Sequence, residues 1–160
     1  MKLRLLSLFQ LVIVSFMASS MCSNYLWAQE DTIAVNINDP PRDGIEVKRG
    51  MTVKGTATIP RGCHLWAMVR RIDFADVWWP QGEGKIDPQT NEWKVSVTFG
   101  QAEDVGWDFN IAVFVVKGSE HILLQNYRIK AMKDGDWKPI EAPPSVCPPK
   151  IRTVKKVGHN

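Results

Sequence analysis

The stretch "HLWAMVRRI" at residues 64–72 is apolar on both of its faces until two arginines begin. Successive side chains of a β-strand point to opposite faces of the sheet, so one face carries Leu65 and Val69. The other face carries Trp66 and Met68. A strand that is apolar on both faces is covered on both sides. The stretch therefore predicts a strand near the middle of a sheet.

The stretch "DFNIAVFVVKG" at residues 108–118 has the same two-sided character. Phe109 and Ile111 begin one apolar face, and Phe114 and Val116 belong to the other. We therefore predict that this stretch is a second central strand.

Alternation with a period of two continues around these two strands, with one apolar and one polar face. In the second alternating stretch, Gly55 occupies an inward-facing position. Proline, glycine and Asp-Gly pairs separate the strands. The pattern of about seven short strands predicts an all-β fold, an immunoglobulin-like antiparallel β-sandwich. The remaining strands are predicted at residues 32–38, 45–59, 77–80, 93–99 and 150–157.

One short helix is predicted before the last strand, in "SEHILLQNYRIKAMKDG". Leu123, Tyr127 and Ala131 recur with a spacing of four, which places them on one helix face. Ser119 is a candidate N-cap, and Gly135 is a candidate stop signal. The proline-rich segment that follows is expected to be extended and unpaired.

The first 28 residues are predicted to be a secretory signal peptide. Lys2 and Arg4 precede an apolar run at residues 5–18, and Ala28 offers a small residue for cleavage. The run is shorter than the ~18–20 apolar residues of a membrane span. Retention of the segment as an anchor, or lipidation at Cys22, are the alternatives. The rest of the chain is thus expected in the periplasm or outside the cell.

Residues 29–160 are enough for a single domain with its own core. The whole chain carries 20 Lys and Arg against 17 Asp and Glu, and two of the cations belong to the signal. The charges of the mature region therefore almost balance. This balance argues against a nucleic-acid partner or an anionic membrane surface. No membrane span is expected after signal cleavage.

Cys63 and Cys147 are the two cysteines outside the signal segment. A low, even count in an exported protein favours a disulfide. In an immunoglobulin-like sandwich the third and seventh strands flank the sixth and start at the same end of one sheet. Cys63 opens the third predicted strand, and Cys147 precedes the last. We therefore expect a Cys63–Cys147 disulfide, with two free thiols as the alternative.

Tryptophan is unusually frequent, with seven in the chain. Trp66 and Trp93 occupy strand positions typical of a core. Trp78 and Trp79 are adjacent in a strand, so they point to opposite faces and only one of them can join the core. The outward tryptophan either packs on the arginines at positions 70–71, contacts a protein, or stacks on a sugar.

Several stretches together resemble a recurring bacterial immunoglobulin-like module. Its pattern is "hlW-x-x-V", then "Y/W-x-P-Q-G", "W-x-x-x-V" and "G-x-x-F-x-I-x-V". The resemblance covers roughly residues 53–116 and implies a sandwich of largely uncharacterised role, often attached to other bacterial proteins. It assigns Trp79 to a structural strand-and-turn unit, which leaves Trp78 as the outward residue. The matching residues are Leu65, Trp66, Val69, Trp79, Pro80, Gln81, Gly82, Trp93, Val97, Gly106, Phe109, Ile111 and Val113.

No catalytic or metal-binding pattern stands out. His64, His121 and His159 lie on different predicted elements, without the spacing of a metal motif. The chain has no G-x-S-x-G sequence. The loop acids lack the pattern of a calcium loop; they are Asp73, Asp76, Glu83, Asp87, Glu103 and Asp104. We therefore expect no catalytic residue, no metal and no cofactor.

These patterns favour an exported, non-enzymatic module that binds another envelope or secreted protein. The expected contact residues are Trp78, Trp107 and Trp137. A carbohydrate-binding module with an exposed tryptophan platform is the first alternative. A metal-binding protein or small metalloenzyme is the second.

Overall fold

The computed structural model describes residues 32–159. Nine strands, one short 3-10 helix and one α-helix follow one another in this part of the chain. In chain order they are β1 (Ala34–Asp39), β2 (Ile45–Val47), β3 (Gly50–Thr58), β4 (Cys63–Arg71), β5 (Val77–Glu83), β6 (Glu92–Thr98), η1 (Ala102–Asp104), β7 (Asp108–Lys117), α1 (Gly118–Asp134), β8 (Ile140–Glu141) and β9 (Lys150–Lys156). The predicted signal peptide lies outside the described residues.

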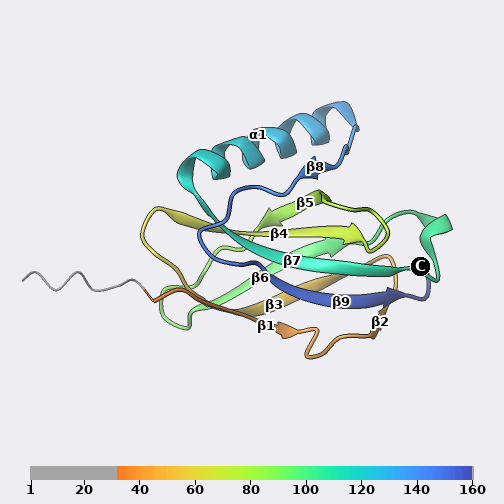
Figure 1. Ribbon diagram of the computed structural model, residues 1–160, viewed down its shortest axis with the longest axis horizontal. Helices are drawn as coiled ribbons and strands as arrows, with labels where there is room; N and C mark the ends of the chain where they lie inside the picture. The colour runs from red at the N-terminus through yellow and green to blue at the C-terminus, as the bar shows by residue number, and fades with distance from the viewer. Residues whose placement is uncertain (1–31, 160) are drawn as a thin grey trace, which may run out of the picture.

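The strands form two sheets, and α1 covers the larger one as a third layer (Figure 1). The smaller sheet has the order β1-β3-β6, and the larger has the order β2-β9-β7-β4-β5-β8. The adjacency of β4, β7 and β9 is that of the third, sixth and seventh strands of an immunoglobulin-like sandwich. The predicted fold class is confirmed. The strands number nine rather than about seven, and β2 pairs with β9 in parallel rather than antiparallel.

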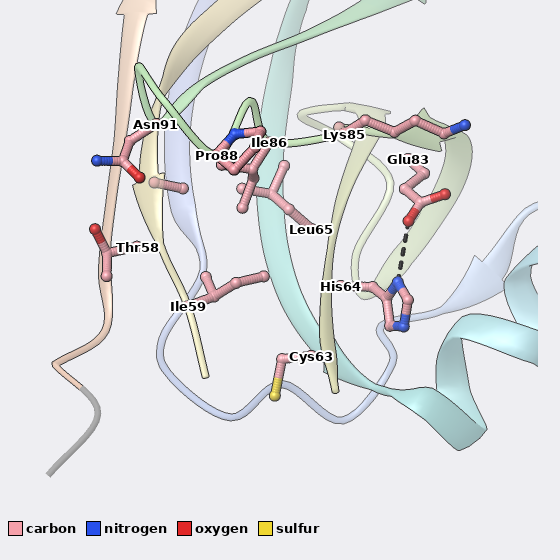
Figure 2. Close-up of a pocket in the computed structure, with 12 residues that line it drawn as sticks. Thr58, Ile59, Cys63, His64, Leu65, Glu83, Lys85, Ile86, Pro88 and Asn91 are labelled. Atoms are coloured by element: carbon pink, nitrogen blue, oxygen red, sulfur yellow. Dashed lines mark hydrogen bonds and ion pairs between the residues drawn. The ribbon is translucent and has the colours of Figure 1, made fainter. Parts of the chain in front are cut away.

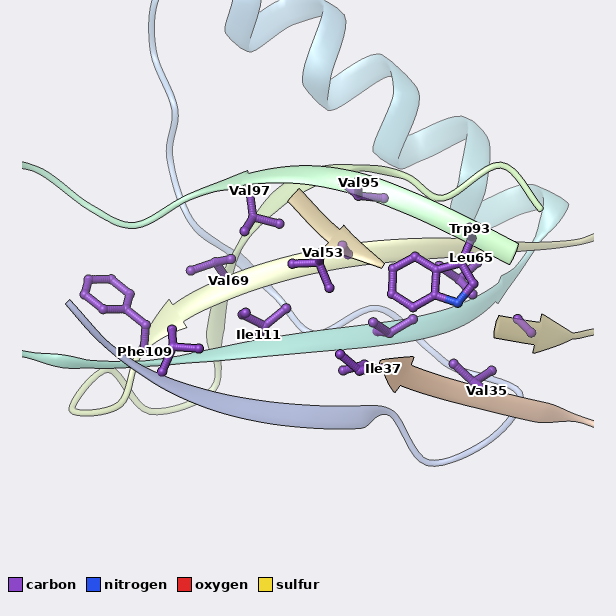
Figure 3. Close-up of a cluster of buried hydrophobic side chains, with 14 of the residues drawn as sticks. Val35, Ile37, Val53, Leu65, Val69, Trp93, Val95, Val97, Phe109 and Ile111 are labelled. Atoms are coloured by element: carbon purple, nitrogen blue, oxygen red, sulfur yellow. The ribbon is translucent and has the colours of Figure 1, made fainter. Parts of the chain in front are cut away.

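The main core lies between the two sheets (Figure 3). The strands β1, β3, β4, β6 and β7 contribute alternate side chains to it, and Trp93 and Phe109 pack among the aliphatic side chains. At Gly55, a Cβ atom would lie 1.9 Å from the backbone oxygen of Asn36 and 2.6 Å from the ring of Trp93. Glycine is therefore required where β1, β3 and the Trp93 indole approach one another.

A second apolar cluster lies on the other face of the larger sheet, against α1. It explains why β4 and β7 are apolar on both faces, because both faces are covered. Leu124 is the contribution of the helix to it. The buried members are Trp66, Met68, Trp78, Ala112, Phe114, Val116 and Leu124.

The helix is confirmed, but its buried face was only partly predicted. Leu123 is exposed, and Leu124 is buried instead. The face that packs on the sheet also carries His121 and Ala131. Lys117 rather than Ser119 is the N-cap, whereas Gly135 ends the helix in a left-handed conformation with φ 70°, as expected.

The segment after α1 is not wholly unpaired, because β8 pairs with β5 at the edge of the larger sheet. No helix within residues 32–159 is long and apolar enough to cross a membrane.

Cys63 opens β4, Cys147 lies just before β9, and both pack against the main core cluster. Both are free thiols in the structure, which therefore does not contain the predicted disulfide. The strand β7 lies between β4 and β9, so these two strands are about two strand spacings (~10 Å) apart, and a bridge would need the segment before β9 to close that gap. Burial raises the pKa of the Cys147 thiol above its ordinary value.

Candidate functional site

The adjacent tryptophans of β5 point to opposite faces, but the assignment of their roles is reversed. Trp78 is only 4% exposed, and its ring packs edge-on against Phe114 at 5.5 Å between centroids. The Arg70 guanidinium lies 4.5 Å from the Trp78 ring. The prediction that Trp78 faces solvent is wrong, because α1 and the segment after it cover that face. The packing of an arginine on this tryptophan was among the alternatives.

Trp79 is half-buried and lines a groove of about 610 Å³ along the β5 and β6 edge. Its Nε1 donates a hydrogen bond to the backbone oxygen of Trp137 at 3.0 Å. The Tyr127 hydroxyl donates to the next carbonyl, that of Lys138, at 2.6 Å. These two bonds tie the segment after α1 to β5 and to the helix. They hold Trp137, which is 43% exposed, beside the groove.

At this groove β5 has a bulge, and the side chain of the bulged residue links the larger sheet to the smaller one. Met68 pairs with Pro80 and Ala67 pairs with Gly82, so Gln81 is the extra residue. The Gln81 amide nitrogen donates to the Trp79 oxygen at 3.1 Å. Its amide oxygen accepts a hydrogen bond of 2.8 Å from the backbone N–H of Thr98, in the edge strand β6.

Positive charge predominates along the groove, where four arginines and one aspartate lie. The charge of Arg71 is neutralised: its Nε and Nη2 bind Asp73 at 2.7 and 2.9 Å, and its Nη1 binds Asp104 at 2.5 Å. The Arg128 side chain makes no hydrogen bond or ion pair within residues 32–159, and its Nε is buried. An unpaired guanidinium therefore faces an aromatic groove.

Trp107, the third expected contact residue, is 43% exposed but does not line this groove. The guanidinium of Arg71 lies 4.5 Å from the Trp107 ring and 4.6 Å from the ring of Phe74. Arg71 thus separates Trp107 from the aromatic side chains of the groove. Trp107 and Trp137 do not form one platform.

A polar cluster joins residues that are distant in the sequence, and Figure 2 shows two of them, His64 and Glu83. His64 Nδ1 lies 3.0 Å from Glu83 Oε1, at the border of a pocket of about 350 Å³. The His64 ring stacks on that of His121 with 3.6 Å between centroids and 10° between planes. The indole Nε1 of the buried Trp66 donates to His121 Nδ1 at 3.0 Å. The interaction connects α1 to β4.

His64, Glu83 and His121 have the side-chain chemistry of a zinc site, and their candidate ligand atoms lie within 4.8 Å of one another. Two features disagree with a metal between them. The indole N–H of Trp66 can only donate, so the Nδ1 lone pair of His121 is occupied by this hydrogen bond. The neutral His121 ring then carries its proton on Nε2, which leaves no free lone pair for a metal. A metal lies close to the plane of each ligating imidazole, and two parallel stacked rings do not share such a point. The arrangement fits a partly buried hydrogen-bond network better.

This network predicts a stability that falls in acid. Burial lowers the pKa of His121, and the charge of His64 lowers it further, while Glu83 opposes the shift. Below the ordinary pKa of about 6.5, the unfolded chain therefore binds a proton that the folded chain rejects, so the free energy of unfolding decreases. His121→Gln keeps an acceptor for Trp66 without titrating. Urea unfolding at pH 7.5 and at pH 5 measures how much the free energy of unfolding decreases in acid. This decrease should be smaller for the variant than for the wild type. An equal loss would contradict the role of His121.

The outer face of α1 is the third feature of functional interest. Four large apolar side chains of the helix are 57–67% exposed, and we call them the outer stripe: Ile122, Leu123, Ile129 and Met132. Ile122 and Ile129 face outward together, whereas Leu123 and Met132 are nine residues apart and lie at the two sides of that face. The opposite face of the helix packs on the sheet through Leu124 and Ala131. The helix thus has an apolar face in the core, and on its outer half exposed apolar side chains lie among exposed polar ones.

Most of the other residues that the sequence assigned a structural role are buried. Trp66, Trp93 and Phe109 are buried in the two clusters. Pro80 and Gly82 are buried in β5 on either side of the bulge. A Cβ atom on Gly82 would lie 3.3 Å from Arg128 Nη1, so this glycine leaves room for the guanidinium.

Sequence reasoning missed the histidine cluster and the roles of Arg128 and of the outer stripe. His64 and His121 are 57 residues apart and meet only because α1 docks beside β4. The exposed stripe was detectable in part, since Ile122 and Ile129 lie off the predicted packing face of the helix.

No family model and no curated protein matches the chain. Among solved structures, murine CRIg is similar with a TM-score of 0.31 and 8% sequence identity, over 81% of this chain and 99% of that one. The fold is therefore assigned from the order and pairing of the strands.

Proposed function

We propose that this protein is an exported, non-enzymatic binding module that contacts another protein through the outer stripe of α1. The signal-like first 28 residues support export, and the resemblance to bacterial immunoglobulin-like modules supports an attachment role. Trp107 and Trp137 lie on other surfaces and are not part of this contact.

The outer stripe is the observation that carries this proposal. Complete burial of an exposed isoleucine, leucine or methionine side chain is worth about 1.5–3 kcal/mol. Single exposed apolar residues are ordinary, whereas several on one face mark an interaction surface. A helix whose exposed apolar residues recur at i and i+7, as Ile122 and Ile129 do, can place both of them in a groove of a partner.

Polar residues within the stripe favour a protein over a lipid surface. Asn126 follows Ile122 by four positions, and Lys133 follows Ile129 by four, so each lies on the same side of the helix as the isoleucine. Both are exposed, as is Lys130. A membrane-bound helix keeps its lysines on the polar face. A protein groove with an acidic rim accommodates both the apolar and the basic side chains.

The proposal is tested with the double variant Ile122→Ser/Ile129→Ser. A tagged mature protein should retain a partner from envelope extract, and the purified partner should then bind the double variant at least about tenfold more weakly, because two apolar anchors are lost. Ile72→Ser is the matched control, because Ile72 is an exposed isoleucine in the turn after β4 and is not part of α1. Its affinity should not change.

Three results would contradict the proposal. They are a partner that binds the double variant as well as the wild type, recovery only of a second copy of this chain, and binding only to anionic lipid vesicles. Binding should also weaken as salt is raised, if an acidic rim faces the two lysines.

A further inference from the structure

The groove between β5 and β6 is separate from the outer stripe and has a different chemistry. Its volume of about 610 Å³ lies within the ordinary range of ligand pockets, about 300–1,000 Å³. It combines an aromatic wall, an unpaired cation and a polar edge. We propose that this groove binds a carboxylated sugar (a hexuronate), either free or as a residue of an acidic polysaccharide.

Arg128 supplies the charge that selects an anion. It reaches the groove from the inner side of α1, through the space left by Gly82 on β5. The acid that lines the groove does not neutralise it, because Asp104 is already bound to Arg71. The planar guanidinium can bind both oxygens of one carboxylate.

Trp137 and Trp79 supply the surface that selects a ring. Their backbone-to-indole hydrogen bond fixes the segment that bears Trp137, so its exposed face is preorganised. The apolar face of a sugar stacks on such an indole. An inorganic phosphate or sulfate would occupy the guanidinium and leave this face uncovered.

The edge of β6 supplies partners for hydroxyl groups. The side chains of Ser96 and Thr98 are exposed and line the groove. Neither hydroxyl makes a side-chain hydrogen bond within residues 32–159, so both can serve a ligand. The groove therefore offers the Arg128 guanidinium, one stacking surface and two hydroxyls along a single edge of the sandwich.

Calorimetric titration of the mature protein with trigalacturonate tests this inference. We expect binding with a Kd of about 1 mM or tighter. Neutral cellotriose, acetate and sulfate are expected to bind much more weakly. Monogalacturonate and polygalacturonate are the two arms that distinguish a free sugar from a polymer. Binding of either one supports the proposal.

Arg128→Met keeps the apolar stem and removes the charge, so it should weaken binding at least about tenfold. The matched control is Arg61→Met, in the exposed turn before β4, and it should leave binding unchanged. Trp137→Ala is a second variant at an exposed position, and it should also reduce binding. Far-UV circular dichroism confirms that each variant is folded.

The proposal is overturned by absence of binding to all three uronates, or by equal affinity for cellotriose or sulfate. Equal affinity for hexaglutamate would replace the sugar by an acidic peptide and would overturn it as well. Unchanged binding by both Arg128→Met and Trp137→Ala would place the ligand elsewhere. None of these outcomes depends on the outer stripe, so this test and that of the protein contact fail independently.

Discussion

Gly55→Ala is expected to lower the free energy of unfolding by about 3 kcal/mol, as in severe overpacking of a core. The added methyl group would lie 1.9 Å from the backbone oxygen of Asn36, and 2.6 Å from Trp93. A flexible side chain could move aside, but a backbone carbonyl paired in a sheet cannot do so cheaply. Urea unfolding followed by tryptophan fluorescence measures the loss.

Gly118→Ala is the matched control for this substitution. Gly118 is the first residue of α1, and a Cβ atom there would have its nearest neighbour, the Gly62 oxygen, at 3.9 Å. Alanine in a helix is favoured over glycine by about 0.5–1 kcal/mol, so this variant should be neutral or more stable. Similar losses for both variants would show that β1 and β3 are not packed as described.

Trp78→Ala is expected to be the second severe change, with a loss of about 3–5 kcal/mol in the free energy of unfolding. The substitution empties the space between β5, Phe114 and the Arg70 side chain. It also leaves a cavity beneath the layer that α1 forms. Chemical unfolding of the purified variant measures the effect.

The comparison with Trp137→Ala makes this result decisive. Trp137 is 43% exposed, so its removal should cost less than about 1 kcal/mol. If Trp78 faced solvent, as strand geometry and the family resemblance suggested, the two variants would behave alike. A loss below about 1 kcal/mol for Trp78→Ala would contradict the buried position.

The core strands could be predicted because alternation leaves each strand few choices. An apolar side chain at every second position must face the core, and a one-residue slip would expose all of them. This reasoning placed Trp93 in the core and Gly55 at an inward position. It also placed the helix before the last strand, since the period changes from two to nearly four there.

The error at Trp78 came from assuming that the second face of β5 is open to water. The position of α1 depends on tertiary packing, which no local pattern of β5 reports. The two-sided apolarity of β4 and β7 did indicate a covering layer. Applied to the neighbouring strand, that indication would have predicted burial for Trp78.

The candidate sites were less predictable because each of them joins distant segments. The groove needs Trp79 from β5, Arg128 from α1 and the edge of β6. The histidine cluster depends on the docking of α1 beside β4. Spacing motifs detect sites built within one element, and neither of these is such a site.

Site-specific photocrosslinking in the cells that produce the protein tests the proposed contact most directly. A photoreactive residue at position 129 should give one discrete adduct with another protein, and its crosslinked peptide should be apolar with acidic flanks. The same residue at position 72 should give none. No adduct at position 129, or the same adduct from both positions, would contradict a contact through the outer stripe of α1.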